Sequence, residues 1–585
     1  MIPLRVALIA GALAALACQA SAATRAPITF AHGMVVTSQQ IASQVGADIL
    51  KQGGNAIDAA VAVGYALAVV DPCCGNIGGG GFATLHLADG RDIFVNFREM
   101  APHAATETMY LDDKGEVIKD ASLAGYRAVA VPGTVMGFDH LLRTYGTLPR
   151  AAVMAPAIRL AAEGFVLDQG DADILAKGTE GFAKEPNAAA IFLKDGKAYA
   201  AGERLVQKDL AVTLNAIAAS GPDIFYRGAI GQQLAAASAV HGGLLTGKDF
   251  ADYTVSEEAP IRCSYRGYDI VSAPPPSSGG TTVCLILNIL EGYPMKDLGW
   301  QSAQSVHVLV EAMRHAFVDR NFQLGDPAFV QNPLSKLLSK DYAAAIRAKI
   351  DPGKAASSKD VQPGTPPHEG TQTTHYSVVD GKGNAVAVTY TINALFGAKV
   401  IAGNTGFFLN DEMDDFTTKP GVANLFGLVQ GKTNAIAPGK RPLSSMSPTI
   451  VTRNGKPYLV LGSPGGSRII SIVAQVIVDV VDYGMTIQQA VDAPRVHHQW
   501  LPDNIAAEPF ALSPDTRARL TAMGYQIADQ TEWGAAESIL IGPPAEATDK
   551  TQSSGNDAMP KSKLAPGLFY GGHDDRRPSG GVAGF

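Results

Sequence analysis

Two segments near the start of the chain carry apolar residues in a pattern typical of helices. From Ile41 to Leu50 the apolar positions recur near a helical period, with Ser38 or Ser43 as the expected N-cap and Gly53-Gly54-Asn55 as the stop signal. Residues 56–70 are apolar almost throughout, as expected for a helix buried on all sides. Both segments therefore predict core helices.

A different pattern begins after residue 373. Residues 374–380 and 384–393 alternate apolar and polar positions and are joined by Gly381-Lys382-Gly383, which predicts a β-hairpin. The preceding segment, 351–372, is rich in Pro, Ser, Lys and Gly and has no apolar period, a composition typical of linkers. A linker that runs directly into the first strand of a new sheet is natural if the chain is cut at that point.

The first 22 residues form a separate unit. Arg5 supplies a positive charge, Val6 to Ala17 is an apolar run, and Ala20-Ser21-Ala22 fits the small-x-small cleavage pattern of a secretory signal peptide. The run is shorter than the roughly 20 residues needed to span a bilayer. We therefore expect export to the periplasm or medium with no membrane span; lipid attachment through Cys18 is the less favoured alternative because the residues before it match that signal poorly.

Composition narrows the classes of protein. The chain has 585 residues, 46% of them hydrophobic and 17% charged, with a net charge of −8. A chain this long with so little charge fills a large core, which excludes disorder and coiled coil. The sequence has no basic run that would bind nucleic acid, so anionic ligands must be held by a few specific residues.

Glycines and cysteines set further limits. Four consecutive glycines, 78–81, are expected to exclude regular structure and to let backbone approach backbone closely, before a strand at 82–87. The context lacks the features of a nucleotide-binding loop. The cysteines beyond the signal have no metal-ligand spacing; we interpret them as buried small hydrophobes, although one disulfide is compatible with export, and neighbouring cysteines rarely pair. They are Cys73, Cys74, Cys263 and Cys284.

Six motifs in order carry a resemblance to a known family. They are NFREMAP at 96–102, PGT at 132–134, QTTHYSVVD at 372–380, PLSSMSPT at 442–449, GSPGGSR at 462–468 and HHQW at 497–500. Together they resemble the γ-glutamyltranspeptidases, also called glutathione hydrolases, over residues 30–540 and the last twelve residues. The resemblance implies an α/β fold, the αββα sandwich of N-terminal-nucleophile hydrolases, with one precursor that cleaves itself into two subunits.

The chemistry of that class is physically reasonable at Thr373. A threonine hydroxyl is a poor nucleophile and needs an adjacent base. Cleavage before Thr373 would free its α-amino group, whose ordinary pKa of about 7.7–8 suits a general base near neutral pH. The expected products are a signal peptide, 1–22, a large subunit, 23–372, and a small subunit, 373–585, which remain together as a heterodimer.

The resemblance implies a γ-glutamyl substrate, glutathione above all, which carries an ammonium beside a carboxylate. Arg98, aided by Ser444, is expected to bind the carboxylate, since a guanidinium fork suits a bidentate pair. Glu412 and Asp415 are expected to bind the ammonium. The remaining implied roles are assistance in that pocket by Asn393, an oxyanion hole of the Gly465 and Gly466 N–H groups, support of the substrate carbonyl by Ser445, and orientation of the Thr373 hydroxyl by Thr391.

The family pattern also leaves alternatives. No cofactor or metal is implied, and the acceptors are water, amino acids or peptides. A related acylase acting on glutaryl-cephalosporins is the alternative enzyme, but Asp415 with Glu412 favours an amino acid substrate, because a glutaryl group lacks the ammonium. An uncleaved periplasmic amino-acid-binding protein is the alternative from another class. Residues 417–435 correspond to a lid in many bacterial members, where Phe426 replaces a tyrosine and keeps only the aromatic cover.

Overall fold

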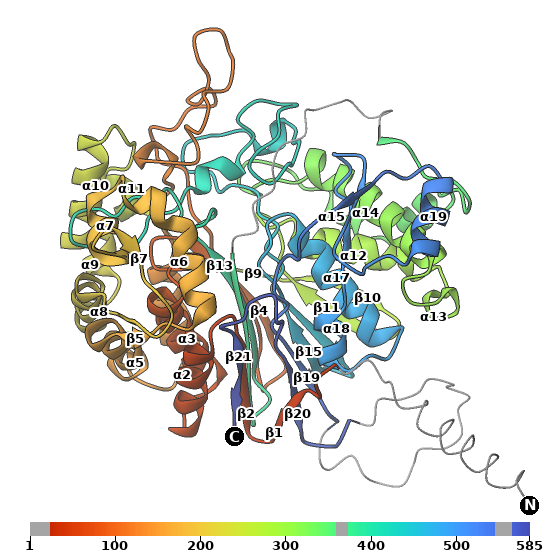
Figure 1. The fold of residues 1–585 in the computed structure, drawn as a ribbon, viewed down its shortest axis with the longest axis horizontal. Helices are drawn as coiled ribbons and strands as arrows, with labels where there is room; N and C mark the ends of the chain where they lie inside the picture. Colours follow the sequence, from red (N-terminus) through yellow and green to blue (C-terminus); the bar gives the residue numbers. More distant parts are fainter. Residues whose placement is uncertain (1–23, 359–372, 544–563) are drawn as a thin grey trace, which may run out of the picture.

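The computed structural model describes residues 24–358, 373–543 and 564–585. Within these ranges, two seven-stranded antiparallel sheets lie face to face between two layers of helices, which confirms the predicted αββα sandwich (Figure 1). The predicted signal peptide with Cys18, and Gln372, lie outside the described residues. No helix in the described ranges has both the length and the apolar character needed to cross a bilayer.

Each sheet is built from strands that are far apart in the sequence. The first sheet has the order β21 (Gly581–Gly584), β2 (Gly33–Thr37), β12 (Thr374–Asp380), β13 (Ala385–Thr391), β3 (Gly80–His86), β4 (Asp92–Phe97) and β9 (Ser256–Glu258). The second has the order β1 (Ile28–Phe30), β20 (Phe569–Gly572), β19 (Ser538–Ile541), β15 (Lys456–Leu461), β14 (Thr449–Arg453), β11 (Tyr268–Ser272) and β10 (Ile261–Tyr265).

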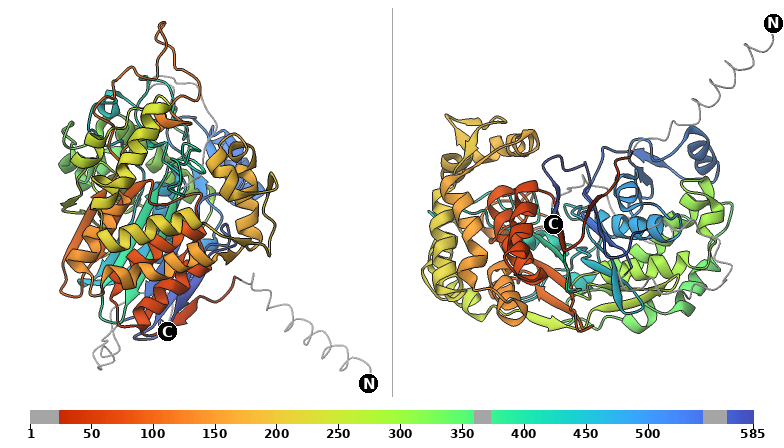
Figure 2. Two further views of the ribbon diagram at one scale, coloured as in Figure 1. Left: turned by 90° about the vertical axis from the view of Figure 1, so that its left-hand side faces the viewer. Right: turned by 90° about the horizontal axis from the view of Figure 1, so that it is seen from below.

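The two helical layers cover the outer faces of the sheets (Figures 1 and 2). The layer beside the first sheet contains α2 (Gln40–Lys51), α3 (Ala56–Val70), α4 (Thr134–Tyr145), α5 (Arg150–Glu163), α6 (Gln169–Phe182) and α8 (Lys208–Ser220). The layer beside the second contains α12 (Gly279–Leu290), α14 (Ala303–Gln323), α16 (Lys340–Arg347), α17 (Arg468–Val481) and α18 (Ile487–Asp492). Short strands β16 (Val496–His497), β17 (Ile505–Ala507) and β18 (Ile527–Asp529) form a third small sheet.

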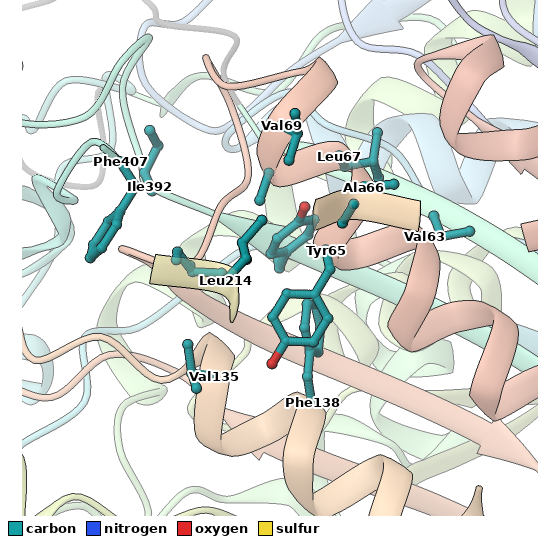
Figure 3. Close-up of a cluster of buried hydrophobic side chains, with 14 of the residues drawn as sticks. Val63, Tyr65, Ala66, Leu67, Val69, Val135, Phe138, Leu214, Ile392 and Phe407 are labelled. Carbon is teal, nitrogen blue, oxygen red and sulfur yellow. The ribbon is translucent and has the colours of Figure 1, made fainter. Parts of the chain in front are cut away.

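Helix α3 confirms the predicted buried helix at 56–70, and every one of its residues is buried. Its side chains form part of the cluster in Figure 3, where Tyr65 packs edge-to-face on Phe138 at 5.3 Å between ring centroids. Asn55 and Asp58 cap its N-terminus reciprocally. For α2, Gln39 is the N-cap, so the prediction of Ser38 or Ser43 was wrong; the Ser43 hydroxyl is instead 2.9 Å from that of Thr37.

The predicted hairpin is confirmed as β12 and β13, two central strands of the first sheet. Tyr376 and Val378 of β12 face the helical layer, whereas Val379 packs in the cluster between the two sheets. This alternation follows from the period of two along a strand. Because both faces are covered, β12 is buried over its whole length, and Thr373 lies directly before its first residue.

The glycine run behaves only partly as expected. The prediction of no regular structure was wrong for Gly80 and Gly81, which begin β3. The close approach of backbone to backbone is confirmed: a Cβ atom on Gly79 would lie 1.8 Å from the carbonyl oxygen of Thr391, and one on Gly78 would lie 2.0 Å from that of Phe408. Glycine is required here because the chain passes against the end of β13.

The cysteines are paired, so their interpretation as unpaired buried hydrophobes was wrong. Cys263 on β10 is bonded to Cys284 on α12, with their Cα atoms 5.9 Å apart, and the neighbours Cys73 and Cys74 are bonded to each other. Sequence periodicity carries no information on which strand and helix meet. Among the described residues, Asp71, Cys73 and Cys74 bring metal-ligand types together, but the sulfurs are joined in the disulfide.

The close contact at Gly79 predicts that adding a Cβ atom there lowers the free energy of unfolding, whereas adding one at an open glycine does not. Gly79→Ala should push the end of β13 away and destabilise the protein by about 1–3 kcal/mol or more, as expected for overpacking a buried site. Gly247→Ala is the matched control, because a Cβ there meets nothing within 4 Å and is expected to change stability by less than about 0.5 kcal/mol. Thermal unfolding followed by circular dichroism measures both; equal midpoints would contradict the assignment.

Candidate active site

A pocket lies where β12 begins and β13 ends. It is lined by Arg98, Arg320, Thr373, Thr391, Asn393, Glu412, Asp415, Phe426, Leu428, Ser444, Ser445, Met446, Gly466, Ser467 and Ile469. The fold therefore brings nine of the ten residues predicted for the site to one cavity. The tenth, Gly465, directly precedes Gly466 in the loop between β15 and α17.

The two threonines face each other across the hairpin. The register of β12 and β13 pairs Thr374 with Tyr390, which sets Thr373 beside Thr391. The Thr373 hydroxyl donates toward the Thr391 hydroxyl oxygen at 3.4 Å. Thr391 Oγ1 also accepts the backbone N–H of Asn393 at 2.8 Å, so the Thr391 side chain is itself held in place. The geometry is consistent with the orienting role predicted for Thr391.

Asn393 follows β13 in a left-handed conformation, with φ of +72°. This conformation is uncommon for a residue with a side chain, although Asn tolerates it better than most. Its side-chain amide donates to the carbonyl of Asp411 at 3.0 Å, which ties the end of the hairpin to the segment that carries Glu412 and Asp415. That segment is the short helix η4 (Glu412–Asp415).

Arg98 is fully buried and is surrounded by carboxylates. Its terminal nitrogens contact Glu412 and Asp415, and Nη1 is also 3.4 Å from Oε2 of Glu99. Burial lowers the pKa of Arg98, but Glu412 and Asp415 outweigh that effect and raise it. Three acidic side chains thus share one guanidinium, and the cluster has capacity to accept a second cation.

The pKa values of the acids reflect this crowding. Burial raises the pKa of Glu99 to about 7, with Arg98 opposing the shift. Burial also raises the pKa of Glu412 well above its ordinary value. A cationic ligand in the pocket would favour the ionised forms of both groups.

The opposite wall is formed by the loops before β14 and before α17. The Ser444 backbone is fixed because its N–H donates to the carbonyl of Pro276 at 2.8 Å and its carbonyl accepts the N–H of Ser278 at 2.8 Å. Gly465 and Gly466 have φ values of +139° and +55°, which favour glycine. These glycines allow the turn that leads into α17.

Phe426 and Leu428, from the segment 417–435 expected to form a lid, line the pocket. A Cβ atom on Gly466 would lie 2.3 Å from the Phe426 ring, so this aromatic side chain packs directly on the glycine predicted for the oxyanion hole. Phe426 offers no hydroxyl, but its backbone carbonyl accepts the side-chain amide of Gln499 at 3.1 Å. Gln499 is held in turn by the Ser467 hydroxyl and by His497. The backbone carbonyl of Phe426 thus holds this segment by a hydrogen bond, which its side chain cannot do because it has no hydroxyl.

Several residues in or beside the pocket had no role predicted from the sequence, and two of them, Gln499 and Arg320, make polar contacts that matter here. Gln499 lies in the HHQW motif, so its position was marked, but nothing in the sequence linked it to the lid. Arg320 lies near the end of α14 between Asp319 and Asn321, a polar stretch that gives no signal of which side chain is buried. Only the tertiary structure places Arg320 in the pocket.

Comparison with known proteins agrees with this geometry. A family model described as gamma-glutamyltranspeptidase matches residues 42–558. The chain belongs to the γ-glutamyltranspeptidase family. The glutathione hydrolase proenzyme of Pseudomonas sp. (strain A14) is 56% identical over 580 residues, which are 99% of each chain.

Acylases are related to this member of the family at lower identity. The acylase ACY 1 proenzyme of Pseudomonas sp. (strain SE83) is 41% identical, over 86% of this chain and 88% of the acylase. The crystal structure of cephalosporin acylase from Bacillus halodurans superposes with a TM-score of 0.81 at 29% identity, covering 96% of this chain and 97% of the acylase. Proteins named glutathione hydrolase and acylase are thus both similar to this chain.

The raised pKa of Glu99 predicts a pH dependence of ligand binding in the pocket. An ammonium binds best when the acids around Arg98 are ionised, so protonation below about pH 7 should weaken binding of L-glutamate. If one proton must be released for binding, the inhibition constant rises by at most about tenfold for each pH unit below the pKa. Inhibition constants measured from about pH 5.5 to about pH 8 test this. Glutarate, which lacks the ammonium, is the control, and an equal pH dependence for both ligands would contradict the assignment.

Proposed function

We propose that the protein is a self-processing γ-glutamyl hydrolase and transferase that acts on glutathione and related compounds. The observation that carries the proposal is the position of Thr373: it opens a central strand, its hydroxyl faces Thr391 at 3.4 Å, and it shares a pocket with both acids and a guanidinium. Family membership and the name of the Pseudomonas relative support it.

Processing would begin with the Thr373 hydroxyl. Attack of Oγ1 on the carbonyl carbon of Gln372 breaks the peptide C–N bond and forms an ester, while the nitrogen takes up a proton and becomes the free α-amino group of Thr373. Water then hydrolyses the ester. The products are a large subunit of 350 residues after loss of the signal peptide and a small subunit of 213 residues.

Catalysis would use the same hydroxyl with its new base. The α-amino group accepts the proton of the Thr373 hydroxyl as the oxygen attacks the γ-carbonyl of the substrate. The N–H groups of Gly465 and Gly466 stabilise the oxyanion, and the protonated amine returns its proton to the leaving amine. Water or the amine of an amino acid or peptide resolves the γ-glutamyl ester by the reverse steps.

Recognition of the γ-glutamyl group would divide its two charges. Glu412 and Asp415 bind the ammonium, with Asn393 beside them, and Arg98 with Ser444 binds the carboxylate. In the described structure Arg98 pairs with both acids. Arrival of the ammonium draws these acids toward the ligand and leaves Arg98 available for the carboxylate. Ser445 supports the substrate carbonyl.

The proposed setting is extracytoplasmic, with the two subunits associated as a heterodimer. The predicted signal peptide supports export. The two acids that pair with Arg98 argue against the acylase alternative, because a glutaryl group has no ammonium for them to bind. Against an uncleaved binding protein stands the threonine pair, which a binding site does not need.

Self-cleavage can be tested by substituting Thr373. Thr373→Ala removes the attacking oxygen and should leave a single precursor on a denaturing gel, whereas the wild type gives two chains. Thr373→Ser is the matched control, since it keeps a hydroxyl and should still be cleaved. Mass spectrometry should find the wild-type small subunit beginning at Thr373. Two chains from Thr373→Ala would refute self-cleavage by this residue.

Recognition of the substrate ammonium can be tested by substituting Asp415. Asp415→Asn should lower kcat/KM for γ-glutamyl-p-nitroanilide by about 100-fold, since it leaves a buried charge unpaired. Activity toward glutaryl-p-nitroanilide should fall less or rise, because no carboxylate is then desolvated against an uncharged chain. Asp414→Asn is the control: Asp414 bonds Ser122 and the backbone of Leu425, so its loss should affect both substrates alike. An unchanged preference in Asp415→Asn would place ammonium recognition elsewhere.

A further inference from the structure

Arg320 is a buried cation whose hydrogen-bond partners, within the part of the chain that the structure describes, are neutral side chains. It is 1% exposed and lines the same pocket as Thr373. Its guanidinium donates to Ser278 Oγ at 3.1 Å, Asn321 Oδ1 at 3.2 Å, Gln430 Oε1 at 2.9 Å and Ser445 Oγ at 3.2 Å. Among the described residues it forms no ion pair with a carboxylate.

The pocket distributes its charges unevenly. Four of its lining residues are charged, and both acids, Glu412 and Asp415, contact Arg98. Arg98 therefore has its countercharges within the protein, whereas no carboxylate of the described ranges contacts Arg320. Burial lowers the pKa of Arg320 to about 10, with Asp415 opposing the shift. A buried charge without a countercharge is costly, and an anionic ligand would offset that cost.

The position of Arg320 indicates which ligand group it would meet. Its Nη2 contacts Ser445, and Ser444 beside it is the residue expected to assist the substrate carboxylate. A γ-glutamyl group brings one ammonium and one carboxylate into the pocket. If the ammonium binds the two acids, Arg98 and Arg320 are both left to neutralise the carboxylate, and Arg320 has no carboxylate partner among the described residues to compete with it.

We propose that Arg320 is a second carboxylate-recognising residue of the γ-glutamyl site, acting together with Arg98. The inference rests on the proposed function. It assigns a specificity-determining contact to α14, which belongs to the segment before Thr373, whereas Glu412, Asp415 and Ser445 lie after it. The carboxylate is then held between two guanidinium groups, and each N–H···O bond is charge-assisted.

A purely structural role predicts something different. Gln430 belongs to the lid segment 417–435, and its Oε1 accepts from both Arg320 and Asn434. Arg320 could thus matter only because it holds the lid. Gln430→Met tests this directly, because it removes the lid contact and keeps the cation. Recognition of the carboxylate requires the charge, whereas positioning of the lid requires only the hydrogen bond.

The experiment compares two competitive inhibitors of γ-glutamyl-p-nitroanilide turnover. L-Glutamate carries the α-carboxylate, and L-isoglutamine replaces it with a neutral amide of similar shape. In the wild type the inhibition constant of L-isoglutamine should exceed that of L-glutamate by about 30-fold or more, as expected for a buried charge pair. In Arg320→Met the ratio should fall at least tenfold. Arg320→Gln, which can still hydrogen-bond, should show the same fall, so the result does not depend on one variant folding.

The controls separate the outcomes. Gln430→Met should keep the wild-type ratio, and Arg320→Lys should show an intermediate ratio because it keeps charge without the planar fork. A wild-type ratio that persists in both neutral variants, or an equal rise of both inhibition constants, overturns the inference. Failure of the proposed function looks different: the wild type would then neither cleave itself nor turn over γ-glutamyl-p-nitroanilide.

Discussion

The antiparallel pairing of β12 with β13 is the constraint on which the site depends. It sets Thr373 beside Thr391, and the chain leaves β13 directly into Asn393, whose amide reaches the segment of Glu412 and Asp415. Gly79 passes against the Thr391 carbonyl with no room for a Cβ atom, so the end of the hairpin is enclosed by backbone. Three parts of the site therefore inherit their positions from one strand register.

The second determinant is the cost of burying charge. A buried cation paired with one acid would be electrically balanced, but Arg98 has three acidic neighbours, and Arg320 contacts no acid among the residues that the structure describes. Such an arrangement is poor for stability alone, because each group is buried without a balanced partner. It becomes favourable when a zwitterion enters, since the ligand supplies one charge of each sign. The imbalance is thus complementary to an amino acid and less so to a glutaryl chain.

Much of this organisation was predictable from the sequence. The helix at 56–70 and the hairpin after 373 carry strong apolar periods, and the family resemblance identified nine residues that the fold gathers in one pocket. Features that depend on distant parts of the chain were not predictable. Cys263 and Cys284 lie on a strand and a helix that meet only in the folded protein, and Arg320 is buried by Ser278 and Gln430, which are far from it in sequence. The N-cap of α2 was missed because Ser43 is occupied in packing against β2.

The strand order has a consequence for a chain cut before Thr373. In the first sheet, β2 lies between β21 and β12, so a strand from before the cut is flanked on both edges by strands from after it. In the second sheet, β1 and β11 enclose four later strands in the same way. Neither piece can slide out without breaking hydrogen-bonded ladders on two sides. After hydrolysis of that one peptide bond, the two chains can separate only if the sheets open, so dissociation and unfolding are the same event and the stability of the cut protein becomes dependent on its concentration.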